Sequence, residues 1–172
     1  GKAYYQTNKA EDLDFAANMY LKALEIDPDF ALAYAGLSDV YTFQYMAYYD
    51  HTDERIAAAK EAAEKGMDID PSLPEVHRSL GRYHMFTGDV ASAERCFLRA
   101  IKYNPKYAVG YRTLGWLKRS SGQYDEALQW ARKSLELAPT DLETLLLLSL
   151  IHMDQKRFTI AISTLQRAIE LG

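Results

Sequence analysis

The sequence predicts an all-α fold in which antiparallel helix pairs stack into an α-solenoid. The first observation is a period, because Pro71, Pro105 and Pro139 stand 34 residues apart, which is typical of a stacked structural repeat. The second is that residue types recur at fixed offsets from each proline, with spacings that keep them on one helical face. The third is composition, since 48% hydrophobic and 26% charged residues are typical of a globular chain.

The first helix of each pair begins just after a proline. At offsets +6, +9, +10 and +13 the pattern is large, aliphatic, small and large, and we expect this face to point into the core. Counted from Pro28, Pro71, Pro105 and Pro139, the residues are Tyr34, Leu37, Ser38 and Tyr41; His77, Leu80, Gly81 and His84; Tyr111, Leu114, Gly115 and Lys118; and Leu145, Leu148, Ser149 and His152.

The second helix of each pair ends just before the next proline and carries a small, large, small pattern that suits close packing. In chain order these residues are Ala16, Tyr20 and Ala23; Ala59, Ala63 and Gly66; Ala93, Phe97 and Ala100; Ala127, Ala131 and Ser134; and Ala161, Leu165 and Ala168. Gly88 and Gly122 lie between the helices of a pair, where a left-handed turn favours glycine. Lys156 takes this place in the last pair, so we expect a looser turn there.

These signals predict ten helices in five pairs. The expected ranges are 1–8 and 11–26, 30–47 and 52–68, 73–86 and 89–102, 107–120 and 123–136, and 141–154 and 157–170. We expect one array over residues 1–172, with repeats at 1–30 (partial and divergent), 31–73 (with an insertion), 74–107, 108–141 and 142–172.

The recurring pattern resembles the tetratricopeptide (TPR) repeat, and the resemblance covers essentially the whole chain. It implies a right-handed superhelix whose first helices line a concave groove, and a protein–protein interaction module that binds a peptide segment or partner protein there. The alternatives are a structural or self-assembly module, or the regulatory arm of a larger multidomain signalling protein. The opening residues resemble TPR regions of bacterial regulators, which implies a fragment of a larger bacterial protein.

The groove should be lined by the offsets that the core does not use, +4, +7, +11 and +14. These are Leu32, Ala35, Asp39 and Thr42; Glu75, Arg78, Arg82 and Met85; Val109, Arg112, Trp116 and Arg119; and Glu143, Leu146, Leu150 and Met153. The candidate contacts for a partner are Asp39, Arg78, Arg82, Met85, Arg112, Trp116 and Arg119. Arginine suits bidentate carboxylate recognition, so we expect an acidic or C-terminal peptide segment as the ligand. The alternative is that the arginines are solvated or pair with groove acids such as Asp39, Glu75 and Glu143.

Two irregularities interrupt the period. Leu146, Leu150 and Met153 make the last groove face apolar, which predicts a stacking interface, either with a following repeat or with another copy in a homo-oligomer. Pro28 and Pro71 are 43 residues apart, and the extra residues fall in a tyrosine-rich stretch near Tyr41–Asp53 that includes Tyr45, Tyr48 and Tyr49. This stretch either forms an aromatic lip at the groove edge or reflects two lengthened helices with tyrosines packed between them.

Composition excludes several function classes. A net charge of −4 argues against nucleic-acid or anionic-membrane partners, and no apolar run is long enough to span a bilayer. The single Cys96 excludes an internal disulfide and fits a reducing compartment, so we expect a cytoplasmic protein, with the periplasm as the alternative. His77 and His84 fall on core positions without further ligands, and no glycine-rich phosphate loop is present, so we expect no metal, no cofactor and no enzymatic activity.

Overall fold

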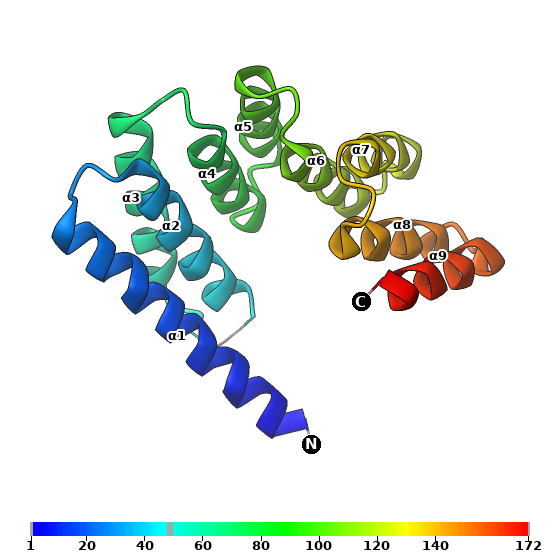
Figure 1. Ribbon diagram of the computed structural model, residues 1–172, viewed down its shortest axis with the longest axis horizontal. Helices are drawn as coiled ribbons and strands as arrows, with labels where there is room; N and C mark the ends of the chain where they lie inside the picture. The colour runs from blue at the N-terminus through cyan, green and yellow to red at the C-terminus, as the bar shows by residue number, and fades with distance from the viewer. Residues whose placement is uncertain (1, 48–49, 172) are drawn as a thin grey trace. The chain divides into compact units, whose positions relative to one another are not determined.

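The computed structural model describes residues 2–47 and 50–171, and their regular secondary structure is entirely helical (Figure 1). The helices are α1 (Lys2–Ile26), α2 (Ala31–Met46), α3 (Asp53–Ile69), α4 (Pro74–Phe86), α5 (Val90–Tyr103), α6 (Ala108–Ser120), α7 (Tyr124–Leu137), α8 (Leu142–Asp154) and α9 (Phe158–Leu171). The chain divides into two compact units, unit 1 (Gly1–Cys96) and unit 2 (Phe97–Gly172), with the boundary inside α5. The all-α helical-repeat prediction is confirmed.

Helices α2 to α9 begin and end within one residue of their predicted limits. Local chemistry explains several of these limits. The Thr52 hydroxyl accepts a hydrogen bond from the Arg55 N–H at the start of α3, and the Asp141 carboxylate accepts one from the Thr144 N–H at the start of α8, each at 3.2 Å. Pro74 opens α4, where its missing N–H would have no intrahelical partner.

The predicted break between residues 8 and 11 is wrong, because α1 is one continuous helix of 25 residues. No glycine or proline occurs in its sequence, and the expected turn consists of residues such as Lys9, Ala10 and Glu11 that favour helix. Since nothing in the backbone chemistry stops the helix, the first predicted pair merges into one element.

Two longer helices, as one of the two alternatives predicted, account for six of the nine extra residues in the 43-residue spacing, and the connection 47–52 accounts for the other three. Helix α2 has 16 residues against 13 in α4, and α3 has 17 against 14 in α5, so each is longer by about one turn. Tyr41 is half-buried against the core of unit 1, and the Tyr45 ring stacks on His51 with ring centroids 3.9 Å apart. Tyr48 and Tyr49 lie outside the described residues.

The turns between α4 and α5, α6 and α7, and α8 and α9 share one hydrogen-bond pattern, including the turn at Lys156. The Gly122 N–H donates to the Arg119 carbonyl at 3.0 Å, and the Lys156 N–H donates to the Met153 carbonyl at 2.9 Å. Lys156 has a φ of 60°, in the left-handed region that Gly88 and Gly122 also occupy. The expected looser turn is therefore wrong, because the helix-ending hydrogen bonds hold lysine in a conformation that glycine adopts more easily.

The predicted core faces are buried or half-buried in both units. In unit 1, α2 packs against α1, α3 and α4, whereas in unit 2, α8 packs against α6, α7 and α9. His77 shares a hydrogen bond between its Nε2 atom and the Pro71 carbonyl at 2.7 Å, and the Tyr111 hydroxyl donates to the Pro105 carbonyl at 3.1 Å. Histidine therefore replaces tyrosine at this offset without losing the contact, which agrees with the prediction of a core histidine.

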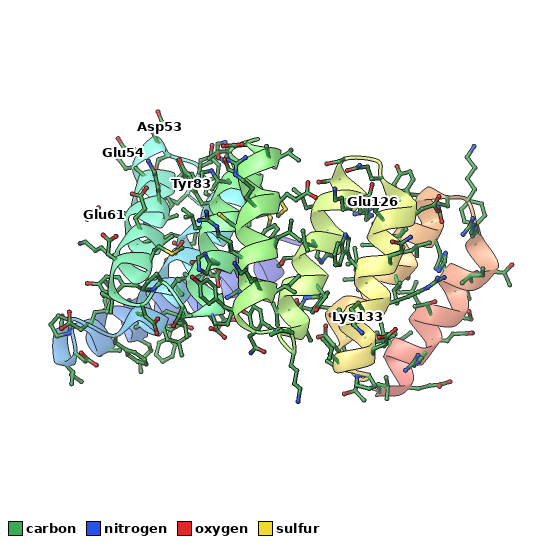
Figure 2. All side chains as sticks on the ribbon, turned by 90° about the horizontal axis from the view of Figure 1, so that it is seen from above. Asp53, Glu54, Glu61, Tyr83, Glu126 and Lys133 are labelled. Carbon is green, nitrogen blue, oxygen red and sulfur yellow. The ribbon has the colours of Figure 1, made fainter. Side chains whose placement is uncertain are left out.

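Second helices carry the solvated charges. Glu54 and Glu61 on α3 and Lys133 on α7 are exposed, and Figure 2 shows the Glu54 and Glu61 side chains at the outer edge of α3. Lys118, at an offset where a large apolar residue is common, is buried on α6 with its Nζ 3.2 Å from a Glu126 carboxylate oxygen on α7. The ion pair compensates for burying the lysine charge.

Candidate functional site

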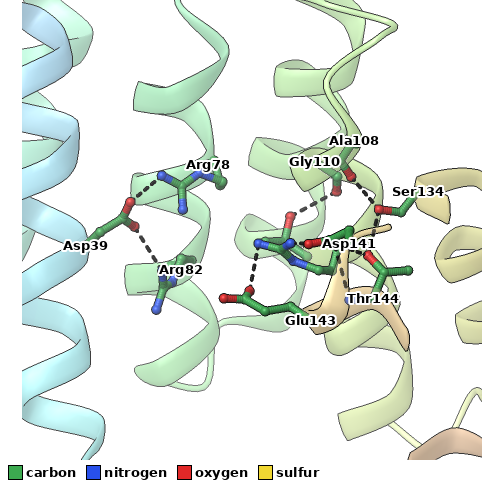
Figure 3. Close-up of polar contacts among 11 residues, drawn as sticks. Asp39, Arg78, Arg82, Ala108, Gly110, Ser134, Asp141, Glu143 and Thr144 are labelled. Carbon is green, nitrogen blue, oxygen red and sulfur yellow. Dashed lines mark hydrogen bonds and ion pairs between the residues drawn. The ribbon is translucent and has the colours of Figure 1, made fainter. Parts of the chain in front are cut away.

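In unit 1 one carboxylate links two of the predicted groove arginines. Arg78 and Arg82 lie one turn apart on α4, and Asp39 faces them from α2 (Figure 3). The Arg78 guanidinium donates to Asp39 Oδ2, and Arg82 Nη1 lies 3.4 Å from Asp39 Oδ1. The Arg78 and Asp39 side chains are each only 15% exposed, so this ion pair is largely shielded from solvent. The contact ties α2 to α4 on their shared face.

A hollow of about 320 Å³ lies next to this ion pair, between α1, α2 and α4. Its lining includes Tyr20 from α1, Phe30 and Leu32 at the start of α2, and the charged side chains of Asp39, Glu75 and Arg78. It therefore combines apolar walls with a charged edge, as ligand sites in proteins commonly do.

Gly36 allows Tyr20 to form one wall of the hollow. A Cβ atom at position 36 would lie 2.3 Å from the Tyr20 ring, closer than real side-chain contacts allow. The aromatic ring therefore lies directly against the backbone of α2 because this position has no side chain.

Two other predicted groove positions on α2 have no exposed surface, although one of them, Ala35, also lines the hollow. Ala35 and Thr42 are fully buried, because α2 is enclosed by neighbouring helices on several sides. Ala35 belongs to a core cluster with Ala31 and Val76, where small side chains let α4 approach closely. Met85, the remaining unit 1 candidate, is half-buried on α4.

In unit 2 the arginines of α6 pair with acids of α8. Arg112 lies 2.6 Å from Asp141 and 2.8 Å from Glu143, and Arg119 lies 2.7 Å from Asp154 (Figure 3 shows the first set). The Glu143 side chain is 70% exposed, whereas Arg112 is 15% exposed. In this ion pair the carboxylate is thus the outer partner.

Asp141 has two structural roles at once. Its carboxylate accepts a hydrogen bond from Arg112 and another from the Thr144 hydroxyl, and it caps α8. Burial by itself raises the pKa of Asp141, but the hydrogen bonds from Thr144 and Arg112 and the charge of Arg112 outweigh it, so the pKa lies below its usual value. The Thr144 hydroxyl also hydrogen-bonds to Ser134 at 3.0 Å, which extends the network to α7.

The apolar candidates of unit 2 differ in exposure. Trp116 is partly buried against the core cluster of α7 and α8, and the Arg119 guanidinium lies 5.5 Å from its ring centroid. Leu146 and Met153 on α8 are 44% and 45% exposed, whereas Leu150 is half-buried. Leu146 and Met153 are therefore the more accessible part of the predicted stacking interface.

Each of the four predicted groove arginines pairs with a carboxylate, and the sequence predicted only some of these partners. Pairing with Asp39 and Glu143 agrees with the stated alternative, whereas Asp141 and Asp154 were not among the predicted partners. Asp141 stands two residues after Pro139, where a helix cap is expected, so a capping signal could have identified it. The roles of Tyr20 and Phe30 in the hollow had no comparable local signal.

Two structural features are absent from the described part of the chain. Over residues 2–47 and 50–171, no group of three or more His, Cys, Asp and Glu side chains is arranged to hold a metal ion. None of the helices within the same ranges combines the length and apolar character needed to cross a bilayer.

Sequence-family comparisons identify the repeats. Tetratricopeptide repeat models match residues 78–141 and 142–171, which together cover more than half of the chain. The chain belongs to the tetratricopeptide repeat family. A search of curated proteins found no match.

Solved structures share the fold at low sequence identity. The crystal structure of TTC0263, described as a thermophilic TPR protein in Thermus thermophilus, has a TM-score of 0.80 at 18% identity, with 99% of this chain and 89% of that chain covered. The crystal structure of MamA has a TM-score of 0.62 at 23% identity, covering 95% and 91%. That of YrrB, described as a TPR protein with an unusual peptide-binding site, has a TM-score of 0.59 at 22% identity, covering 95% and 80%. These likenesses support the fold.

Proposed function

We propose that this chain is a protein–protein interaction module that binds an extended peptide segment of a partner on its first-helix surfaces. The observation that carries the proposal is the hollow in unit 1, because five predicted groove residues line it: Leu32, Ala35, Asp39, Glu75 and Arg78. A partly apolar hollow beside ordered charged groups is suited to anchor one side chain of a bound segment. The solved relative YrrB, described as having a peptide-binding site, supports the same class of ligand.

The preference for an acidic segment remains a prediction. Arg78, Arg82, Arg112 and Arg119 each contact a carboxylate of this chain, so a partner carboxylate would have to share or displace those contacts. A guanidinium has five N–H donors and can serve two carboxylates, as Arg112 does with Asp141 and Glu143. The internal ion pairs also hold the arginines in place before a partner binds, which reduces the entropy lost on binding.

The test selects peptides and then measures where they bind. Peptides selected from a random phage-displayed library are synthesised with a fluorescent label, and their affinities are measured by anisotropy for the wild type and for Arg78→Ala and Arg112→Ala. We expect at least one of these two variants to bind about tenfold more weakly, because arginines are common anchors at interfaces. Arg99→Ala, which removes an exposed arginine from the second helix α5, is the matched control and should retain the affinity. Unchanged affinity in both groove variants, with intact helical circular dichroism, would contradict the proposal.

Exposed apolar side chains favour a second candidate function, self-assembly through the end of unit 2. Leu146 and Met153 on α8 are exposed, as are Phe158, Ile162 and Ile169 on α9. Sedimentation equilibrium over a range of concentrations tests this candidate. A dimer that disappears in Leu146→Glu supports self-assembly, whereas a monomer at every concentration excludes it.

A further inference from the structure

We infer that the hollow of unit 1 is a pocket for a lysine or arginine side chain of the bound segment. The inference rests on the proposed function and specifies the partner chemistry at one part of the same surface. It differs from the acidic ligand predicted from the sequence, because that prediction considered the arginines without their internal partners.

The walls of the hollow suit the aliphatic stem of a long basic side chain. Leu32 is 44% exposed, and Phe30 and Tyr20 contribute aromatic surface from two sides. Lysine and arginine bury their methylene groups along such surfaces while the charged end group remains in a polar environment. Aromatic rings also attract cations through their negatively polarised faces.

The charge at the edge of the hollow favours a cation. The charged lining residues are Asp39, Glu75 and Arg78, and Asp39 is paired with both Arg78 and Arg82, so that Glu75 is the carboxylate of the lining that these arginines do not pair with. Arg78 donates to Asp39, whereas the Glu75 carboxylate makes no hydrogen bond or ion pair with any other described residue. Two further acids, Asp27 and Asp29, lie in the turn just before Phe30. A basic side chain in the hollow would therefore pair with Glu75 without displacing an existing ion pair.

The Tyr20 hydroxyl adds a polar group from another helix, α1. It approaches the backbone of α2 at Gly36, and among the described residues it has no hydrogen-bond partner. A phenolic oxygen can accept a hydrogen bond from an ammonium or guanidinium group. The hollow thus offers a carboxylate and a hydroxyl acceptor beside apolar walls, an arrangement that suits a basic side chain better than an acidic or a purely apolar one.

The experiment titrates the ¹⁵N-labelled chain with three small probes, followed by the backbone amide signals in two-dimensional NMR. The probes are N-acetyl-arginine amide, N-acetyl-leucine amide and N-acetyl-glutamate amide. We expect the arginine probe to shift the amides of Gly36, Asp39 and Glu75, with an affinity at least about fivefold higher than that of the other two probes.

A matched pair of variants tests the role of the carboxylate. Glu75→Gln removes the charge from the first turn of α4, and Glu54→Gln does the same in the first turn of α3, where Glu54 is exposed and outside the lining of the hollow (Figure 2). Both changes lose a similar interaction with a helix N-terminus. We expect Glu75→Gln to weaken binding of the arginine probe about fivefold or more, and Glu54→Gln to change it less than about twofold.

The outcomes separate this inference from the proposed function. Equal binding of the leucine probe, stronger binding of the glutamate probe, no binding of the arginine probe, or an unchanged arginine affinity in Glu75→Gln would each overturn the basic-side-chain pocket. The proposed function would still stand if the selected peptides depend on Arg112 in unit 2. The converse result is also possible: the arginine probe binds at the hollow, but the selected peptides bind Arg78→Ala and Arg112→Ala as tightly as the wild type. That result would support the pocket and contradict the proposed peptide-binding surface.

Discussion

Arg78 in unit 1 and Arg112 in unit 2 occupy the same repeat position but pair in opposite directions along the chain. Arg78 contacts Asp39, which belongs to the preceding first helix, α2, whereas Arg112 contacts Asp141 and Glu143, at and just after the start of the following first helix, α8. The repeat position therefore determines which face a side chain occupies. The ion-pair partner of the arginine depends on which neighbouring helix has an acidic residue level with it along the helix axis.

The two ion-pair clusters also differ in what else they support. Asp39 pairs with two arginines of α4, whereas Asp141 pairs with Arg112, caps α8 and joins a hydrogen-bond network with Thr144 and Ser134. The unit 2 cluster thus combines a tertiary contact with a local helix signal. The difference teaches that equivalent arginines can contribute unequally to stability.

The largest expected effect compares Asp141→Ala with Asp39→Ala. Loss of Asp141 removes a helix cap and the main partner of a half-buried arginine. We therefore expect Asp141→Ala to lower the free energy of local unfolding by about 2 kcal/mol, and Asp39→Ala to lower it by about 1 kcal/mol. Amide hydrogen exchange measures the free energy of local unfolding in both variants. It is followed in α8 for Asp141→Ala and in α2 and α4 for Asp39→Ala. Equal costs would show that the cap and network add nothing to the ion pair.

Acid should weaken unit 2 through the same carboxylate. The lowered pKa of Asp141 means that its contribution to stability is fully present above the ordinary aspartate pKa, about 4, and is lost as the pH falls through that value and below. Asparagine retains capping ability but does not titrate, so Asp141→Asn should reduce the fall in stability below about pH 4, measured by urea unfolding with tryptophan fluorescence. An unchanged pH dependence in Asp141→Asn would show that protonation of Asp141 does not cause the loss of stability in acid.

The turns allow a smaller, reciprocal test. Lys156→Gly should stabilise the chain by about 1 kcal/mol, because glycine adopts a positive φ without the steric cost of a side chain. Gly122→Lys should destabilise it by a similar amount, about 1 kcal/mol. Hydrogen exchange in α8 and α9 measures the first change, and exchange in α6 and α7 measures the second. A loss of stability in Lys156→Gly would mean that the lysine side chain contributes more than its backbone strain costs.

The smallest expected effect concerns His152, buried on α8. Burial lowers its pKa, and the charges of Arg157 and Arg132 lower it further. The unfolded chain therefore takes up the proton first, so the stability of unit 2 should be constant above about pH 6.5 and should fall slightly as the pH drops below it. NMR titration of the His152 ring checks the pKa directly, and His152→Gln should remove this part of the pH dependence. A ring that titrates above its ordinary pKa would contradict the electrostatic assignment.

Much of this architecture could be predicted because it repeats locally. The offsets from Pro71, Pro105 and Pro139 predicted the limits of eight helices and most of the buried faces, since periodicity and helix-ending chemistry act within one or two turns. The same reasoning failed at α1, where divergence from the repeat suggested a break that the residue types do not impose. It also failed at Ala35, because exposure on α2 depends on helices that pack from elsewhere in the chain.

The repeat class and the limits of α2 to α9 follow from the sequence, because spacing along one helix defines them. The same spacing predicts that Arg78, Arg82, Arg112 and Arg119 share the groove face. Only the tertiary structure decided that Asp39, Asp141, Glu143 and Asp154 pair with these arginines. It also decided that Tyr20 lies over Gly36, and that Tyr20 lines one hollow together with Glu75, whose carboxylate has no ion-pair partner within the described part of the chain. Ion pairs and hollows depend on distances of a few ångströms between different helices. Those distances are set by how side chains pack between the helices, and no local periodicity encodes them.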